Sequence, residues 1–115
     1  MDFRASLVDL EKGQEIDVFE FTVEKKDVPE SERNDYIPPS VFKKGLDLLK
    51  KREITKSDKR VKSYLDKLER ASTFANKLLA RGENAITEEE FREGERLYEE
   101  VYATGVNFDI EPMNL

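Results

Sequence analysis

Apolar residues recur at three- and four-residue steps through residues 57–82, the longest patterned stretch of the chain. The recurring positions are Val61, Tyr64, Leu65, Leu68, Ala71, Ser72, Ala75, Leu78 and Leu79. On a helix this spacing places the side chains on one stripe, and Gly82 is typical of the residue just past a helix end. The pattern predicts a long helix whose stripe packs on the rest of the chain or on another molecule.

Two further amphipathic helices are predicted on either side of it. The first covers residues 40–52, opens at Pro39 or Ser40, and has Gly45 within its apolar face. Glycine weakens a helix by about 1 kcal/mol relative to alanine, so we expect another element to approach closely there. The other covers residues 88–103, where Thr87 and Glu90 have the spacing of a capping box. Lysines cover the polar face of the first helix, and glutamates open the second.

The N-terminal residues show the patterns of strands. Two runs rich in β-branched and aromatic residues, 3–10 and 15–24, are separated by four residues that include Gly13, which is typical of a hairpin. In the second run Ile16 and Val18 face opposite to Phe19 and Phe21. This change of face predicts either a bulge or a strand that is apolar on both sides.

The tail, residues 106–115, alternates apolar Val106, Phe108 and Ile110 with polar residues. Period-two alternation predicts an extended segment. It either adds a third strand to the hairpin or pairs with a neighbouring copy by strand addition, and both alternatives remain open from the sequence.

The fold class expected from these elements is α+β in a single domain of residues 1–115. A β-hairpin (1–24) is packed on a three-helix unit (40–105), and the extended tail has a third strand of this sheet as one of its two alternatives. Residues 25–39 are charged and carry Pro29, Pro38 and Pro39, so we expect a loop whose end is pinned to the core by Tyr36 and Ile37. Such a long loop is either functional or a plain flexible excursion.

Charge is distributed in blocks along the chain. The net charge is −6, but residues 1–38 carry 11 acids and 5 bases, residues 39–82 carry 5 acids and 13 bases, and residues 83–115 carry 10 acids and 2 bases. Opposite blocks either pack together within the monomer or steer assembly with copies and partners. The acidic ends and the pI near 4.9 argue against nucleic-acid binding through the basic middle.

The composition excludes most catalytic chemistry. With no cysteine and no histidine, the chain lacks thiolate nucleophiles, disulfides, the commonest general base and most zinc ligands. The five glycines stand singly, so no phosphate-binding loop or dinucleotide fingerprint is present. We therefore expect no enzyme activity, no cofactor and no metal. No apolar run is long enough to span a membrane, and residues 1–30 lack a signal-peptide layout, so a cytoplasmic location is expected.

The run LERASTFANKLL followed by ITEEEFREG carries a family resemblance. Residues 86–94 approximate the pattern (F/V)T-x-(D/E)-(D/E)-(F/L)-x-x-G, with one additional glutamate, and follow a helical segment. Over roughly residues 41–94 the chain resembles the tail assembly chaperones of long-tailed bacteriophages. The resemblance implies a non-enzymatic protein that coats the tape-measure protein, recruits tail-tube subunits and assembles with copies of itself.

These observations favour a protein–protein binding or assembly module that forms homo-oligomers. The alternative is a small inhibitor that docks on a host protein or nucleic-acid enzyme. Because the three helices and the hairpin supply enough apolar surface to cover the stripe of the central helix, we place external binding elsewhere. The candidate partner-binding residues are Phe108 and Ile110 in the tail, Tyr36 in the loop, and Lys59, Lys62 and Arg70 on the basic face of the central helix.

Overall fold

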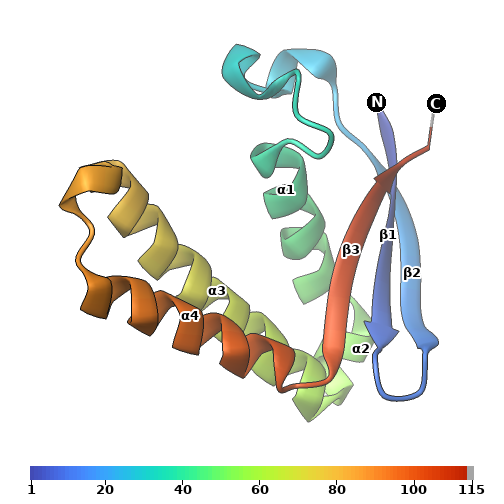
Figure 1. Cartoon of the computed structure of the whole chain (residues 1–115). Coiled ribbons are helices and arrows are strands. Elements are labelled where there is room, and N and C mark those ends of the chain that lie inside the picture. Colours follow the sequence, from blue (N-terminus) through green and yellow to red (C-terminus); the bar gives the residue numbers. More distant parts are fainter. Residues whose placement is uncertain (114–115) are drawn as a thin grey trace.

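The computed structural model describes residues 1–113 and has the expected α+β fold (Figure 1). The strands are β1 (Asp2–Asp9), β2 (Gln14–Thr22) and β3 (Val106–Pro112). The helices are α1 (Pro39–Lys50), α2 (Glu53–Ser57), α3 (Lys59–Arg81) and α4 (Glu88–Tyr102). Residues 114–115 of the expected tail lie outside the described residues.

The tail forms a strand within its own chain. The sheet has the order β2-β1-β3, and β1 is antiparallel to both neighbours. Along the outer edge of β3 the backbone donors are used internally: the Phe108 N–H donates to the Tyr64 hydroxyl at 3.0 Å, and the Ile110 N–H donates to Asp109 Oδ1 at 3.1 Å. Pro112, which follows in this alternate set, has no N–H. Positions 108, 110 and 112 therefore offer no free N–H to a further strand.

The change of face in the second strand results from a bulge. The register between β1 and β2 shifts between Leu7 and Val8, because Leu7 pairs with Asp17 whereas Val8 pairs with Glu15. Ile16 is the extra residue, and it packs against the core. The bulge accounts for Ile16, whereas Val18 pairs with Ser6 on the open face of the sheet, so β2 also carries an apolar residue on its other side.

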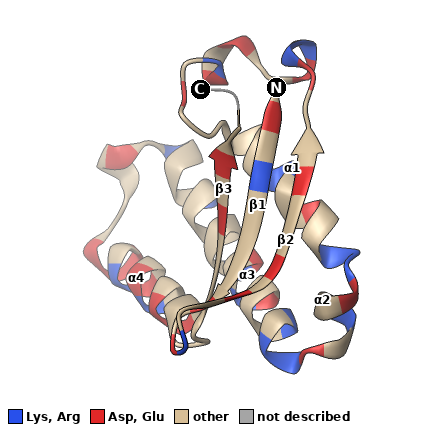
Figure 2. Cartoon of the chain, turned by 90° about the vertical axis from the view of Figure 1, so that its right-hand side faces the viewer, with Lys and Arg blue, Asp and Glu red and all other residues tan. Residues whose placement is uncertain are grey.

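All helices lie on one face of the sheet, and the other face is open to solvent (Figure 2). The core fills the space between them and draws on every strand and on α1, α3 and α4. Its buried members include Phe3, Ala5, Leu7, Phe21, Val41, Leu49, Val61, Tyr64, Leu65, Leu68, Leu97, Val101, Val106, Phe108 and Ile110. The stripe of the central helix is therefore internal as far as Ala71.

Gly45 allows α1 to approach the sheet closely, as expected. A Cβ at this position would lie 2.5 Å from Ile110 Cδ1 and 3.4 Å from the rings of Phe108 and Phe21. Contacts below about 3 Å between carbon atoms are repulsive, so the packing of α1 on β2 and β3 depends on the missing side chain.

The helix boundaries are set by side-chain caps. Thr87 and Glu90 form the predicted capping box of α4. For α3 the sequence predicts a link over residues 53–57 with Ser57 or Thr55 as the cap. In the structure Asp58 is the cap instead, and it accepts hydrogen bonds from the Arg60 and Val61 N–H groups. Residues 53–57 are not a plain link but form the short α2. The buried Thr55 hydroxyl of α2 donates a hydrogen bond to the Leu49 carbonyl in the last turn of α1.

The loop before α1 contains two 3-10 turns, Lys25–Asp27 and Glu30–Glu32. Val28 is buried and Ile37 packs against the core, so these residues anchor the loop. Tyr36 is 69% exposed. The expectation that Tyr36 pins the loop is therefore wrong.

The α3–α4 pair extends away from the sheet as an arm, with the Gly82 turn at its far end (Figure 1). The radius of gyration is 15.4 Å, compared with about 13 Å for a compact chain of this length. The surface area is 7880 Å², compared with about 6,500 Å² for a folded monomer of this mass. The arm, formed by α3 beyond Ala71 and by α4 (residues 72–102), contributes to the elongated shape because its far end projects past the sheet (Figure 1).

Candidate functional site

Two residues expected to contact a partner are buried in this chain's own core. Phe108 is 4% exposed and Ile110 is 2% exposed, because both side chains point from β3 towards α1 and α3. The Phe108 ring lies 5.8 Å from that of Phe42 and 6.2 Å from that of Phe19, measured between centroids. This burial removes both residues from the candidate binding surface.

The remaining candidates are exposed but do not share a surface. Lys59 and Lys62 lie in the first turn of α3, beside α2, whereas the loop that carries Tyr36 lies at the opposite end of the molecule (Figure 1). Arg70 lines a shallow depression between α3 and α4 together with Glu93 and Glu100. The structure therefore keeps Lys59 and Lys62 together on one turn but brings neither Tyr36 nor Arg70 to them.

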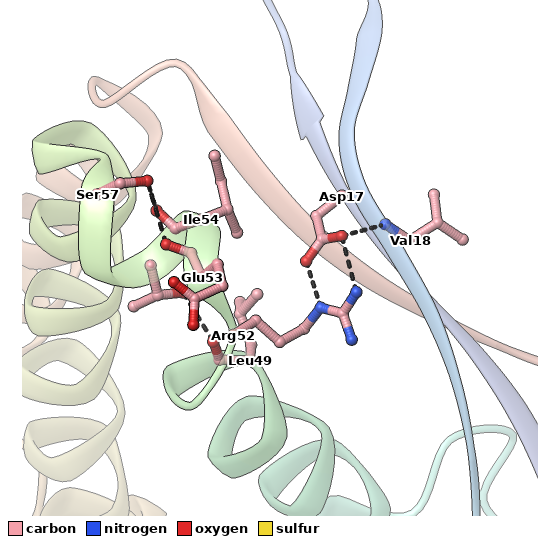
Figure 3. Close-up of polar contacts among 8 residues, drawn as sticks. Asp17, Val18, Leu49, Arg52, Glu53, Ile54 and Ser57 are labelled. Atoms are coloured by element: carbon pink, nitrogen blue, oxygen red, sulfur yellow. Dashed lines mark hydrogen bonds and ion pairs between the residues drawn. The ribbon is translucent and has the colours of Figure 1, made fainter.

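The strongest polar contacts are structural clamps between the helices and the sheet. Arg52, just after α1, forms an ion pair with Asp17 of β2, with Arg52 Nη2 lying 3.0 Å from Asp17 Oδ1 (Figure 3). The guanidinium also lies over the Phe19 ring, 4.6 Å from its centroid. The hydrogen bond from Arg52 to Asp17 raises the pKa of Arg52. This geometry fixes the α1–α2 corner against the edge of the sheet.

A second clamp holds the start of α3 on the hairpin turn. Arg60 Nη2 donates to Asp9 Oδ2 at 2.8 Å, and Asp9 Oδ1 accepts from the N–H groups of Glu11 and Lys12. The hydrogen bond from Arg60 lowers the pKa of Asp9. Within residues 1–113, Asp9 and Thr55 are the buried polar or charged residues. We therefore assign Asp9 a role in stabilising the fold.

The charge blocks meet within the monomer. Three ion pairs join the basic middle of the chain to its acidic ends, namely Arg52–Asp17, Arg60–Asp9 and Arg81–Glu90. Packing of opposite blocks within one chain thus accounts for part of the charge pattern. The solvent face of the sheet keeps exposed carboxylates, among them Glu20 and Glu111 (Figure 2).

Residues 1–113 contain no group of three or more metal-ligating side chains placed to hold an ion. Across the same residues no helix is long and apolar enough to cross a membrane.

A large groove lies between α1 and α3, with a volume of about 880 Å³. Its apolar lining comes from core residues such as Leu65 and Ile110, which the domain already buries. Lys50 of α1 and Glu69 of α3 form an ion pair across it, with Lys50 Nζ 3.5 Å from Glu69 Oε2. The ion pair therefore spans an open groove whose floor is formed by residues of the core.

The unexplained apolar surface lies on the arm. Leu79, Phe91 and Tyr102 are 63%, 61% and 66% exposed. They border a groove of about 530 Å³ between α3 and α4, which is lined by Ala75, Leu78, Leu79, Ile86, Phe91, Gly94, Glu95, Tyr98, Glu99 and Tyr102. We call these ten residues the arm groove. Exposed apolar clusters of this kind are typical of protein interaction sites.

The form of the arm groove follows from its residue types. Gly94 faces the Phe74 ring, from which a Cβ would be 3.7 Å away, an ordinary contact distance. Large side chains, Leu79 from α3 and Phe91, Tyr98 and Tyr102 from α4, form the walls. Its two charged residues, Glu95 and Glu99, are both acidic and exposed.

The sequence pattern places this apolar surface and the buried residues of α4 on one broad apolar face. In α4, Leu97 and Val101 are buried in the core, whereas Phe91, Tyr98 and Tyr102 form a second row on the same helix, of which the half-buried Tyr98 also packs against the core. Together the two rows make an apolar face that is too wide for a single neighbouring helix to cover. That width was the signal in the sequence that a second surface exists.

Comparison with protein-family models, with curated proteins and with solved structures finds no match to this chain. A function can therefore be inferred only from the chain's own residues.

Proposed function

We propose that this chain is a non-enzymatic protein-binding module and that the arm groove is its binding surface. The observation that carries the proposal is the clustering of three large apolar side chains, Leu79, Phe91 and Tyr102, each more than 60% exposed on adjacent helices. Apolar anchors grouped in a concave site supply most of the affinity of protein interfaces.

The construction of the arm supports the same role. In the part of α3 beyond Ala71, Leu78 is buried, but it is not a member of the contiguous core of the domain. The distal arm therefore depends on contacts between its own two helices, which bury little apolar area.

Two biological assignments of this role remain proposals. One is the tail assembly chaperone suggested by residues 41–94, whose partners would be tape-measure and tail-tube proteins. The other is an inhibitor that docks on a host protein or nucleic-acid enzyme. Self-association and a cytoplasmic location remain predictions under both assignments.

Capture of partners by matched variants tests the proposal. We expect the tagged wild-type chain to retain a defined protein from its source cells, and the double substitution Phe91→Ala/Tyr102→Ala to lose it while circular dichroism and melting stay near wild type. Leu10→Ala removes an apolar side chain that is exposed on the hairpin turn, and it should have no effect. The retained protein is then purified and its binding measured directly.

A further variant separates the two candidate surfaces. Tyr36→Ala removes an aromatic side chain as exposed as Tyr102, but on the loop. If Tyr36→Ala abolishes binding and Phe91→Ala/Tyr102→Ala does not, the loop is the binding surface and the proposal is wrong.

A further inference from the structure

We infer that the arm groove accepts a basic amphipathic helix from its protein partner. This inference rests on the proposed function and adds the chemical class of the partner. It follows from the charge left over on α4, from the length of the aromatic row, and from the lack of a free N–H at positions 108, 110 and 112 of β3.

The charge of α4 is only partly neutralised within the chain. The helix has seven glutamates and two arginines. Its ion pairs are Arg92–Glu88, Arg96–Glu93, Arg96–Glu100 and Arg81–Glu90. Among residues 1–113 no ion pair includes Glu95 or Glu99, and these are the two charged residues of the arm groove. Lysine or arginine beside the apolar anchors of a partner would therefore meet carboxylates that have no cation of their own.

The dimensions of the arm groove fit a helix. Phe91, Tyr98 and Tyr102 are spaced i, i+7 and i+11 along α4, which places them along about 16 Å of one face. A partner helix of about 11 residues spans this length, with apolar residues at i, i+4 and i+7 facing the row. The neighbouring α3 contributes Ala75 and Leu79 as the other wall, so the partner would lie between two helices.

A second copy of this chain fits the same surface poorly. Antiparallel pairing of two α4 helices around a two-fold axis, with Phe91 opposite Tyr102, places Glu95 and Glu99 of both copies near that axis. Like charges at the centre of an interface are unfavourable. A partner strand is also disfavoured, because the backbone groups of α3 and α4 are used within the helices and the donors of β3 are used internally.

Peptide binding tests the inference with three probes of about 14 residues. The first has leucines at i, i+3, i+4 and i+7 with lysines elsewhere, and the second has glutamates in place of the lysines. The third has the composition of the first with its leucines dispersed around the helix. Fluorescence anisotropy with labelled peptides measures the dissociation constants at low and high salt.

We expect the leucine–lysine peptide to bind and the other two to bind at least about tenfold more weakly. The double substitution Glu95→Lys/Glu99→Lys should weaken binding of the leucine–lysine peptide by about tenfold and strengthen binding of the glutamate peptide. Phe91→Ala/Tyr102→Ala should abolish binding. The matched control Glu20→Lys/Glu111→Lys changes two exposed carboxylates on the open face of the sheet and should leave binding unchanged, apart from a small effect of net charge.

Each contrary result overturns the inference in a recognisable way. If Glu95→Lys/Glu99→Lys and Glu20→Lys/Glu111→Lys weaken binding of the leucine–lysine peptide equally, the peptide is attracted non-specifically to an acidic protein. Stronger binding of the glutamate peptide to the wild-type chain would assign an acidic partner. A concentration-dependent dimer that Phe91→Ala/Tyr102→Ala abolishes would make a second copy the occupant. Absence of peptide binding, with a captured partner still lost in that variant, would overturn the helix assignment and leave the proposed function standing.

Discussion

The hydroxyl of Tyr64 on α3 accepts a 3.0 Å hydrogen bond from the backbone N–H of Phe108 on β3. The Tyr64 side chain is buried, and this burial raises the pKa of its hydroxyl. The contact joins the central helix to the third strand and satisfies a donor that would otherwise face an apolar interior.

Removal of this hydroxyl should destabilise the domain. We expect Tyr64→Phe to lower the free energy of unfolding by about 1–3 kcal/mol, because the Phe108 N–H would be buried without a partner. Urea denaturation measures the loss, and amide hydrogen exchange should show faster exchange at Phe108. Tyr102→Phe, at an exposed position, is the control and should change stability by less than about 0.5 kcal/mol. Equal effects of the two substitutions would contradict the assigned role of the hydrogen bond.

The close approach at Gly45 predicts a compensating pair of substitutions. Gly45→Ala improves helix propensity by about 1 kcal/mol, but its methyl group would meet Ile110 Cδ1 at 2.5 Å, and overpacking typically costs about 1–3 kcal/mol. We expect a net loss of about 1 kcal/mol. Ile110→Val removes the opposing methyl, so in the Gly45→Ala background it should cost less than it does alone. Additive losses in a double-mutant cycle would show that the two sites are not in contact.

Asp9 should contribute to acid sensitivity. Its hydrogen bond from Arg60 lowers its pKa in the folded state, so at low pH the unfolded chain takes up the proton first. The stabilisation is present above the unfolded pKa of about 4 and is lost as the pH falls through the folded pKa. We expect Asp9→Asn to be less stable than wild type at pH 7 and to have a shallower slope of stability below about pH 4. Glu20→Gln, at an exposed carboxylate, is the control, and an unchanged slope in Asp9→Asn would contradict the prediction.

Phe108 should be important for stability rather than for association. Its ring is buried between Phe42 and Phe19, and Phe→Ala at a buried site typically costs about 3–5 kcal/mol. We expect Phe108→Ala to lower the melting temperature strongly or to prevent folding. The milder Phe108→Leu keeps the site filled and should bind a partner as wild type does. Loss of binding in a stably folded Phe108→Leu would restore the tail as a binding element.

Local chemistry explains why much of the fold was predictable. The capping box at Thr87 and Glu90, the hairpin around Gly13 and the alternation of Val106, Phe108 and Ile110 each depend on neighbours within a few residues. The α+β class and the close packing of α1 on the sheet at Gly45 follow from the same periodicities. The cap at Asp58 was missed because Thr55, Ser57 and Asp58 are all capable helix caps, and only the packing of α2 selects among them.

The residue pattern specifies which faces of the helices are apolar, whereas the packing of elements distant in the sequence sets which of those faces are covered. Periodicity fixes the direction of a side chain relative to its own helix axis, but it does not fix how far neighbouring elements extend. The sheet covers α3 only as far as Ala71, and α4 carries one apolar row more than α3 can bury. For that reason Phe108 and Ile110, expected at the surface, lie in the core, whereas Phe91 and Tyr102, on the apolar face of α4, lie exposed.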